Sequence, residues 1–276
     1  MKVFINNGAD CSKMKGPKSP LYFLVINSSV TLPMIKMVVE KGGEQLLTLV
    51  DEWKHFPAES YLQNKRLTFE IFEFLWKKMG EMSINHTILF TKDEIDLSIL
   101  DWVYKESKSK MNLAQLCITA CERLRYNTKV IDWLFSKGLS YMQFKNETSP
   151  IQVAAKRFGA GIIVRHLMEI TGVVCSEAFT EACGSGNEEV VIVFLAYKRY
   201  FKRFEPLSLS LSKNKKVQKM ISSYNKGKSL WRTERHHLFP TAFQKCVLTF
   251  ILFNKQILQK RLRIPKPLLK KIIKHI

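Results

Sequence analysis

The chain is 276 residues long, 46% of its residues are hydrophobic, and its formal net charge is +20. This apolar content is typical of a globular protein, which excludes a wholly disordered chain. No apolar run approaches the roughly 18 residues that a transmembrane helix needs, and residues 1–10 lack the apolar stretch of a signal peptide.

A helix-ending pattern recurs along the chain: an apolar cluster, a polar turn and then a glycine, as expected where a helix ends in the left-handed conformation. The glycines of the four clearest copies are Gly42, Gly80, Gly138 and Gly172. With three weaker copies included, the central apolar residues of the series are Val39, Leu75, Val103, Leu134, Leu167, Leu195 and Ile221. Their recurrence about every 30 residues predicts a stacked array of small helical repeats rather than one closed domain.

Each repeat is expected to hold two short helices, and residues 148–172 are the clearest example. Ser149 can accept a backbone N–H as the N-cap of the first helix, and Pro150 suits the first helical position. A Phe-Gly-Ala-Gly turn occupies residues 158–161, the second helix follows at residues 162–170, and Gly172 ends it.

This repeat resembles the ankyrin repeat. The segment Ser149-Pro150-Ile151-Gln152-Val153-Ala154 is similar to the Thr-Pro-Leu-His-x-Ala opening of that family, and Ser19-Pro20-Leu21-Tyr22 is similar to a second copy. Gly8-Ala9-Asp10 is similar to the close of a repeat, and Gly186-Asn187 lies in a segment similar to its inter-helix turn. The resemblance covers residues 5–224 and implies an all-α, ankyrin-like solenoid of about seven stacked helix pairs.

The resemblance also implies a non-enzymatic scaffold for protein–protein interaction. In ankyrin arrays the hairpin tips and the inner face of the first helices hold the partner. The residues expected there are Lys13, Lys15, Phe144, Lys145, Asn146 and Glu147. Because the resemblance starts at a repeat closure, either a first helix pair is missing from the sequence or residues 1–10 form a partial cap.

Residues 225–276 are expected to form a separate basic helical module. One helix should begin at Thr241, which can cap it, and a proline-containing segment at residues 264–267 should lead into a last helix at residues 268–276. Residues 198–276 carry 21 Lys and Arg against two acids, a net of 21 − 2 = +19, so nearly all the excess charge lies there. Such a surface attracts acidic proteins, nucleic acid or anionic lipid.

This module resembles the adaptor boxes that follow ankyrin arrays in ubiquitin-ligase substrate receptors. Residues 241–246 and 264–267 are similar to the two elements of a SOCS box, although Ala242 stands where that family has the leucine that enters elongin C. Residues 264–273 are similar to the start of an F-box, and the Trp, His-His and Phe-Pro series at residues 231–240 resembles the ends of ankyrin proteins from protists and large DNA viruses. An adaptor subunit would then contact Cys246, Phe250, Ile264, Pro265, Pro267 and Leu268.

The alternative is that this helical module only caps the array. In that case the residues buried against the last repeat should be Phe243, Val247, Phe250, Leu269 and Ile272. Nucleic-acid binding through the basic C-terminal region is a third hypothesis. The aromatic and basic run at residues 197–204 has that look, but its aromatic spacing favours a buried helix stripe.

The sequence contains no signature of catalysis. No phosphate loop, nucleophile elbow or catalytic cysteine motif occurs, and the six histidines do not stand at metal-binding spacings with acids or cysteines. We therefore expect no catalytic residue, no metal site and no cofactor. The six cysteines lack disulfide-framework spacing, which favours reduced thiols and an intracellular location, in the cytoplasm or the nucleus.

Overall fold

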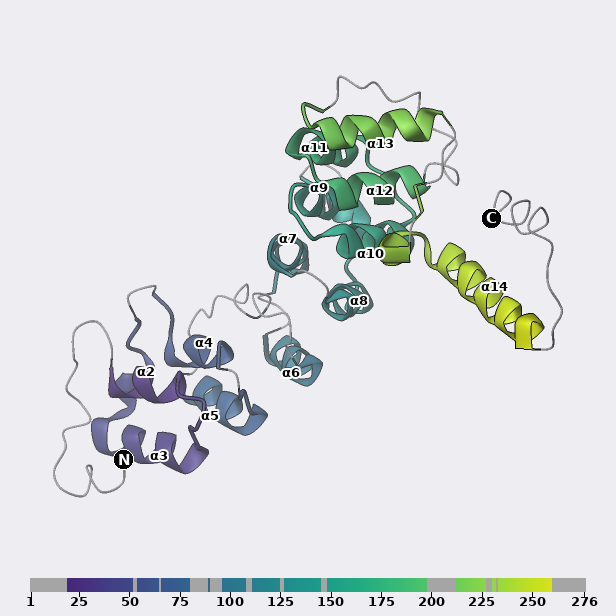
Figure 1. The fold of residues 1–276 in the computed structure, drawn as a ribbon. Coiled ribbons are helices and arrows are strands. Elements are labelled where there is room, and N and C mark those ends of the chain that lie inside the picture. Colours follow the sequence, from purple (N-terminus) through teal and green to yellow (C-terminus); the bar gives the residue numbers. More distant parts are fainter. Residues whose placement is uncertain are drawn as a thin grey trace. The chain divides into compact units, whose positions relative to one another are not determined.

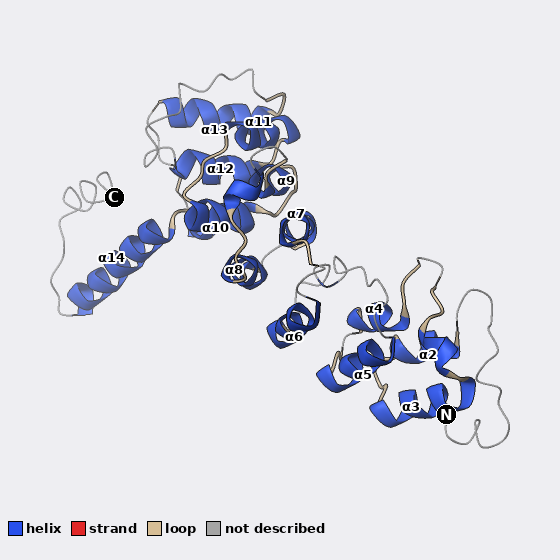
Figure 2. Ribbon diagram, turned by 180° about the vertical axis from the view of Figure 1, so that it is seen from behind, coloured by secondary structure: helices blue, strands red, loops and turns tan. Residues whose placement is uncertain are grey.

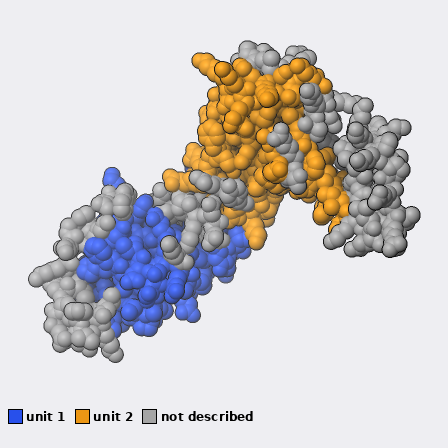
Figure 3. All heavy atoms as spheres, in the orientation of Figure 1, with its two compact units in different colours: residues 1–116 blue, residues 117–276 orange. Residues whose placement is uncertain are grey.

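The computed structural model of the chain describes residues 19–51, 54–64, 66–79, 89, 96–107, 111–124, 127–144, 148–197, 212–226, 230–231 and 233–259. Within these ranges every regular element is a helix and no strand occurs (Figure 1, and Figure 2 coloured by element type). The all-α class expected from the sequence is therefore confirmed. The chain divides into two compact units, residues 1–116 and residues 117–276 (Figure 3).

Unit 1 is built from helix pairs. Its described helices are α2 (Pro20–Val25), α3 (Leu32–Gly42), the 3-10 helix η1 (Glu44–Leu47), α4 (Pro57–Leu62), α5 (Phe69–Met79) and α6 (Leu97–Ser107). Helix α2 packs against α3, and α4 against α5, while α2 also packs against α4 and α3 against α5. Trp102 of α6 lies edge-on to Phe69 and Trp76 of α5, with ring centroids 5.7 and 5.9 Å apart, so aromatic packing joins α6 to α5.

Unit 2 repeats this arrangement and ends in a longer helix. Its described helices are α7 (Leu113–Arg123, which spans the boundary at residue 116), α8 (Thr128–Ser136), η4 (Tyr141–Phe144), α9 (Pro150–Ala155), α10 (Gly161–Thr171), α11 (Ser176–Ser185), α12 (Glu188–Tyr197), α13 (Lys215–Asn225), η6 (Thr233–Leu238) and α14 (Thr241–Gln259). The pairs α9–α10 and α11–α12 stack, because α9 packs against α11 and α10 against α12. Helix α8 packs on the other side of α10, and α13 packs on α12.

Local sequence sets the start of the first helix in two of these pairs. Ser149 Oγ accepts the N–H of Gln152 at 3.2 Å, the Gln152 side chain accepts the N–H of Ser149 at 2.8 Å, and Pro150 opens α9. This capping box confirms the predicted N-cap. Ser19 is the N-cap of α2, and its hydroxyl accepts the N–H of Tyr22 at 3.1 Å.

The predicted helix-ending glycines are confirmed in part. Gly172 ends α10 in the left-handed conformation, with φ of 66°, as the sequence predicts. Gly42 does not have this role, because it is the buried last residue of α3 and the positive φ of 89° falls on Gly43. Two glycines in succession give the same sequence signal, so the prediction was wrong by one position. Gly80 lies outside the described residues.

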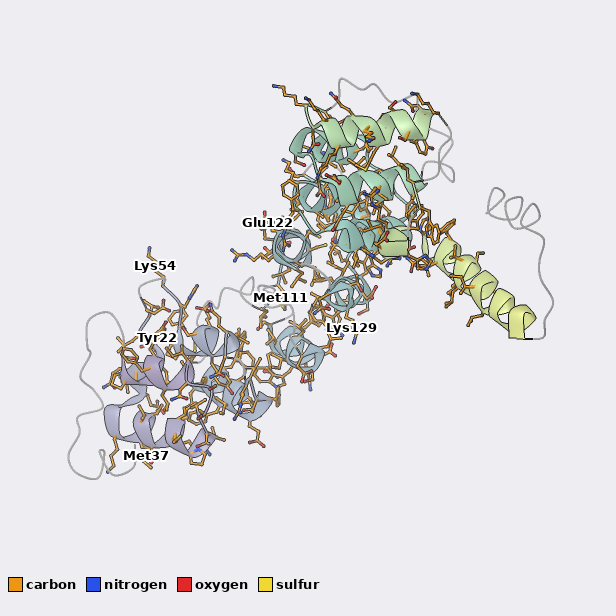
Figure 4. All side chains as sticks on the ribbon, viewed as in Figure 1. Tyr22, Met37, Lys54, Met111, Glu122 and Lys129 are labelled. Atoms are coloured by element: carbon orange, nitrogen blue, oxygen red, sulfur yellow. The ribbon has the colours of Figure 1, made fainter. Side chains whose placement is uncertain are left out.

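The recurring apolar residues of the sequence form the cores of the two units. They lie on α3, α5, α6, α8, α10, α12 and α13, and none of the seven is more than 5% exposed. In Figure 4, side chains fill the spaces between the ribbons of packed helices within each unit. Every helix that carries one of these residues therefore buries one face against its neighbours.

Buried asparagines join successive helix pairs in both units. Asn64, just after α4, donates from Nδ2 to the carbonyl oxygens of Val25 and Asn27 at the end of α2, at 2.7 and 2.9 Å. Asn187, just after α11, donates from Nδ2 to the carbonyl oxygens of Ala155 and Arg157 at the end of α9, at 3.0 and 2.6 Å. In each case the side chain satisfies helix-end carbonyls that have no partner within their own helix.

Candidate functional site

The residues predicted for the array surface are mostly beyond what the structure describes. Lys13, Lys15, Lys145, Asn146 and Glu147 lie outside the described residues. Phe144 is described, and it corrects the expectation, because its side chain is only 3% exposed and packs 6.0 Å from the Tyr141 ring, centroid to centroid. The short helix η4 turns Phe144 inward and leaves Met142, which the sequence did not single out, 68% exposed.

The predicted contacts of the C-terminal module can be located only on α14. Cys246 is exposed on this helix, and Phe250 belongs to it, although the side chain of Phe250 lies outside the described part of the chain. Ile264, Pro265, Pro267 and Leu268 lie outside the described residues, as do Leu269 and Ile272 of the alternative cap. Of the predicted module, the described residues include α14 and the segment that leads into it.

The first residue of α14 is bound to α10 by a polar cluster. Glu169 Oε1 accepts the backbone N–H of Thr241 at 2.7 Å and the O–H of Tyr197 at 2.7 Å. Glu169 Oε2 accepts from the hydroxyl of Thr241 at 3.0 Å and from Arg165 Nη1 at 2.9 Å. Arg165 Nη1 also donates to the Thr241 hydroxyl at 2.7 Å. Four donated hydrogen bonds thus converge on one carboxylate and fix where α14 begins.

This cluster keeps Glu169 ionised. Burial works against the charged form, but the hydrogen bonds from Thr241 and Tyr197, together with the charge of Arg165, outweigh it and hold the pKa of Glu169 below its ordinary value. The helix predicted here is confirmed, but Thr241 is not its N-cap as predicted. Thr241 is the first helical residue, and its hydroxyl binds α10 instead of its own helix.

The segment before α14 covers the ends of α10 and α12. Helix η6 packs against both, and Leu238 at its end is 1% exposed. A Cβ atom added to Gly161, the first residue of α10, would lie 2.6 Å from Leu238 Cδ2, so the absence of a side chain there admits this leucine. Phe239 follows at 8% exposed and lies 5.1 Å from the ring of Phe243, centroid to centroid. Helix η6 and Phe239 therefore cover part of α10 and α12.

Helix α14 itself is not packed as a cap. Phe243 and Val247, expected to be buried against the last repeat, are only half-buried. Leu248, Ile251 and Leu252 are 55%, 50% and 53% exposed. Residues 246–253 read Cys-Val-Leu-Thr-Phe-Ile-Leu-Phe, with one polar residue in eight. A helix that is apolar on every side is normally buried.

Over the described residues, no three His, Cys, Asp or Glu side chains gather where they could hold a metal ion. None of the helices in these ranges has both the length and the apolar character needed to cross a membrane. Neither the protein-family models, nor the curated proteins, nor the solved structures with which the chain was compared give a match.

Proposed function

We propose that this chain is a non-enzymatic recognition protein, in which an ankyrin-like array of helix pairs binds one protein and helix α14 docks into a second. The proposal rests on the exposure of α14. This helix is attached to α10 at its first residue, yet three of its large apolar side chains are about half exposed. Exposed apolar patches of this kind mark interaction surfaces.

The asparagine links support the ankyrin-like interpretation of residues 19–226. Asn64 and Asn187 occupy the same place in their helix pairs, after the first helix, and each reaches back to the first helix of the preceding pair. Arg157 makes a related link, since its Nη1 donates to the carbonyl oxygen of Leu124 at the end of α7, at 2.7 Å. A link that recurs at the repeat spacing is expected of stacked repeats, each of which contacts its neighbours along the array.

The exposure of α14 supports docking over simple capping. Leaving a leucine or isoleucine in water forgoes about 1.5–3 kcal/mol relative to full burial, and Leu248, Ile251 and Leu252 forgo roughly half of that each at their observed exposure. The anchor at Thr241 and the buried Leu238 attach this segment to α10 without help from these three side chains. Their burial in a partner protein would recover this free energy.

A narrower proposal is that the docking partner is an adaptor subunit of a cullin-type ubiquitin ligase. The resemblance of residues 241–246 to the first SOCS-box element supports it, because this segment forms the exposed first turns of α14 with Cys246 at the surface. The exposed Ala242 opposes strong binding, since an alanine supplies less apolar area than the leucine of that family.

The test compares three forms of the full-length protein as bait in extracts. The first is unchanged, the second carries Leu248→Ser, Ile251→Ser and Leu252→Ser, and the third carries Met142→Ser and Phe158→Ser as a control for loss of exposed apolar side chains elsewhere (68% and 66% exposed). We expect one protein to be captured in stoichiometric amount by the first and third forms and lost from the second.

Purified ligase adaptor subunits, the elongin type that binds SOCS boxes and the type that binds F-boxes, are then titrated against the full chain and its Ala242→Leu variant by calorimetry. Binding that Ala242→Leu strengthens supports the ligase proposal, and no binding to either form removes it while leaving the docking proposal in place. Equal capture by all three baits would refute docking through α14. Turnover of a substrate by the purified protein, abolished by a point substitution, would refute the non-enzymatic role.

A further inference from the structure

Helix α13 and its flanks present a group of lysines, with no acidic residue among them, on the surface of unit 2. Lys213, Lys215, Lys216, Lys219 and Lys226 are all exposed. No Asp or Glu occurs between residues 206 and 233. Within the described ranges, Lys216 forms an ion pair, with its Nζ 3.4 Å from Glu188 Oε1. The opposite face of α13 is apolar, and Val217, Met220 and Ile221 are buried there, where α13 packs on α12.

Neither capping nor helix stability explains this choice of residues. The end of a repeat array needs a polar face, but lysines mixed with acids would serve equally well. Helix stability favours acids in the first turn, where the helix dipole is positive. The first turn of α13 contains no acid, as is true of several other helices of the chain, but it also begins with two lysines, Lys215-Lys216, which the dipole disfavours.

The lysines also lie in a line. Lys215, Lys219, Ser222 and Lys226 are spaced i, i+4, i+7 and i+11, which places them on one side of the helix. The line is about 16 Å long at 1.5 Å per residue. Duplex DNA carries one phosphate charge about every 1.7 Å of its axis, counted over both strands, so a line of this length can face several phosphates.

We propose that the exposed face of α13, from Lys213 to Lys226, binds the phosphate backbone of double-stranded nucleic acid without reading its sequence. Lysine ammonium groups bind phosphates as point charges, and serine hydroxyls are among the groups that donate to them. The half-buried Ser222 and Ser223 lie between Lys219 and Lys226 on α13 and supply such donors. This surface is separate from α14 and does not depend on the function proposed for that helix.

The composition of the face favours nucleic acid over a membrane or an acidic protein. A helix that binds a membrane surface inserts its apolar side into the lipid, but the apolar side of α13 is buried within unit 2. The cores of protein–protein interfaces are enriched in aromatic residues, Met and Arg and depleted in Lys. The exposed residues of α13 and its two flanks are instead lysines and Asn225.

The test uses the full-length protein and a short fluorescent DNA duplex, with binding followed by anisotropy from about 50 to about 200 mM salt. One variant carries Lys215→Gln, Lys219→Gln and Lys226→Gln. The matched control carries Lys41→Gln, Lys105→Gln and Lys129→Gln, which remove the same charge from exposed positions on other helices (Lys129, on α8, is labelled in Figure 4). Thermal melts of both variants should match the unchanged protein, because all six side chains are exposed.

We expect the α13 variant to lose at least about tenfold in affinity at about 100 mM salt. Its slope of log K against log salt should be shallower by about 2.7, because each of the three lost phosphate contacts contributes about 0.9 to that slope. The control variant should retain the affinity and slope of the unchanged protein, and duplexes of unrelated sequence should bind alike. Equal losses in the two variants, or no duplex binding by the unchanged protein, would overturn the proposal. Binding of phosphatidylserine vesicles that depends on the three α13 lysines, with no duplex binding, would assign the face to a membrane and overturn it as well.

Discussion

The asparagine link in unit 2 gives the sharpest test of the stacked-pair architecture. Asn187 is 1% exposed, and its amide satisfies two carbonyl oxygens at the end of α9. Asn187→Ala leaves the Ala155 carbonyl without a donor, whereas the part-buried Arg157 carbonyl still accepts the N–H of Ala160 at 3.4 Å. One unsatisfied buried group costs about 1–3 kcal/mol. We therefore expect a loss of about 2 kcal/mol of unfolding free energy.

Urea unfolding of the full chain, followed by far-UV circular dichroism, measures this loss. Gln143→Ala removes an amide from an exposed position and should change the unfolding free energy by less than about 0.5 kcal/mol. Asn64→Ala in unit 1 should behave like Asn187→Ala, because Asn64 is 3% exposed and makes the same two bonds. An Asn187→Ala protein as stable as the Gln143→Ala control would refute the idea that this link holds the pairs together.

Two further predictions concern the approach to α14. Gly161→Ala should displace Leu238 and lower the unfolding free energy by about 1–3 kcal/mol. In a double-mutant cycle with Leu238→Ala, the loss in the double variant should be smaller than the sum of the two single losses. The pKa of Glu169 is below its ordinary value, so its contribution to stability is complete above that ordinary value and is lost as the pH falls through the lowered pKa. Glu169→Gln should therefore destabilise the protein at neutral pH and remove this part of its acid dependence, as acid titrations of unfolding free energy would show.

Features set by neighbouring residues could be predicted from the sequence. The Ser149-Pro150 start of α9 depends on a side chain that bonds a backbone group three residues away, so its signal is local. The same is true of Gly172, whose left-handed conformation ends α10. The apolar residues spaced by about 30 positions were recognisable as core because each lies in a helix with its own amphipathic pattern.

Features that depend on distant residues could not be predicted. The sequence around Asn187 indicates only an inter-helix turn, because its bonding partners lie 30 and 32 residues earlier. The sequence predicts that the Thr241 hydroxyl caps its own helix, because nothing near it in sequence reveals Glu169, 72 residues away. Phe144 was expected in an open hairpin tip, and a 3-10 turn that pairs it with Tyr141 buries it instead.

Photo-crosslinking from position 251 tests most directly whether the exposed apolar side of α14 contacts another protein. Ile251 is 50% exposed, so a photoreactive residue can replace it without disturbing a core. The full chain, expressed in cells and irradiated, should form a crosslink to one other protein that mass spectrometry identifies reproducibly. Crosslinks confined to this same chain would contradict the claim and show that α14 packs against its own molecule.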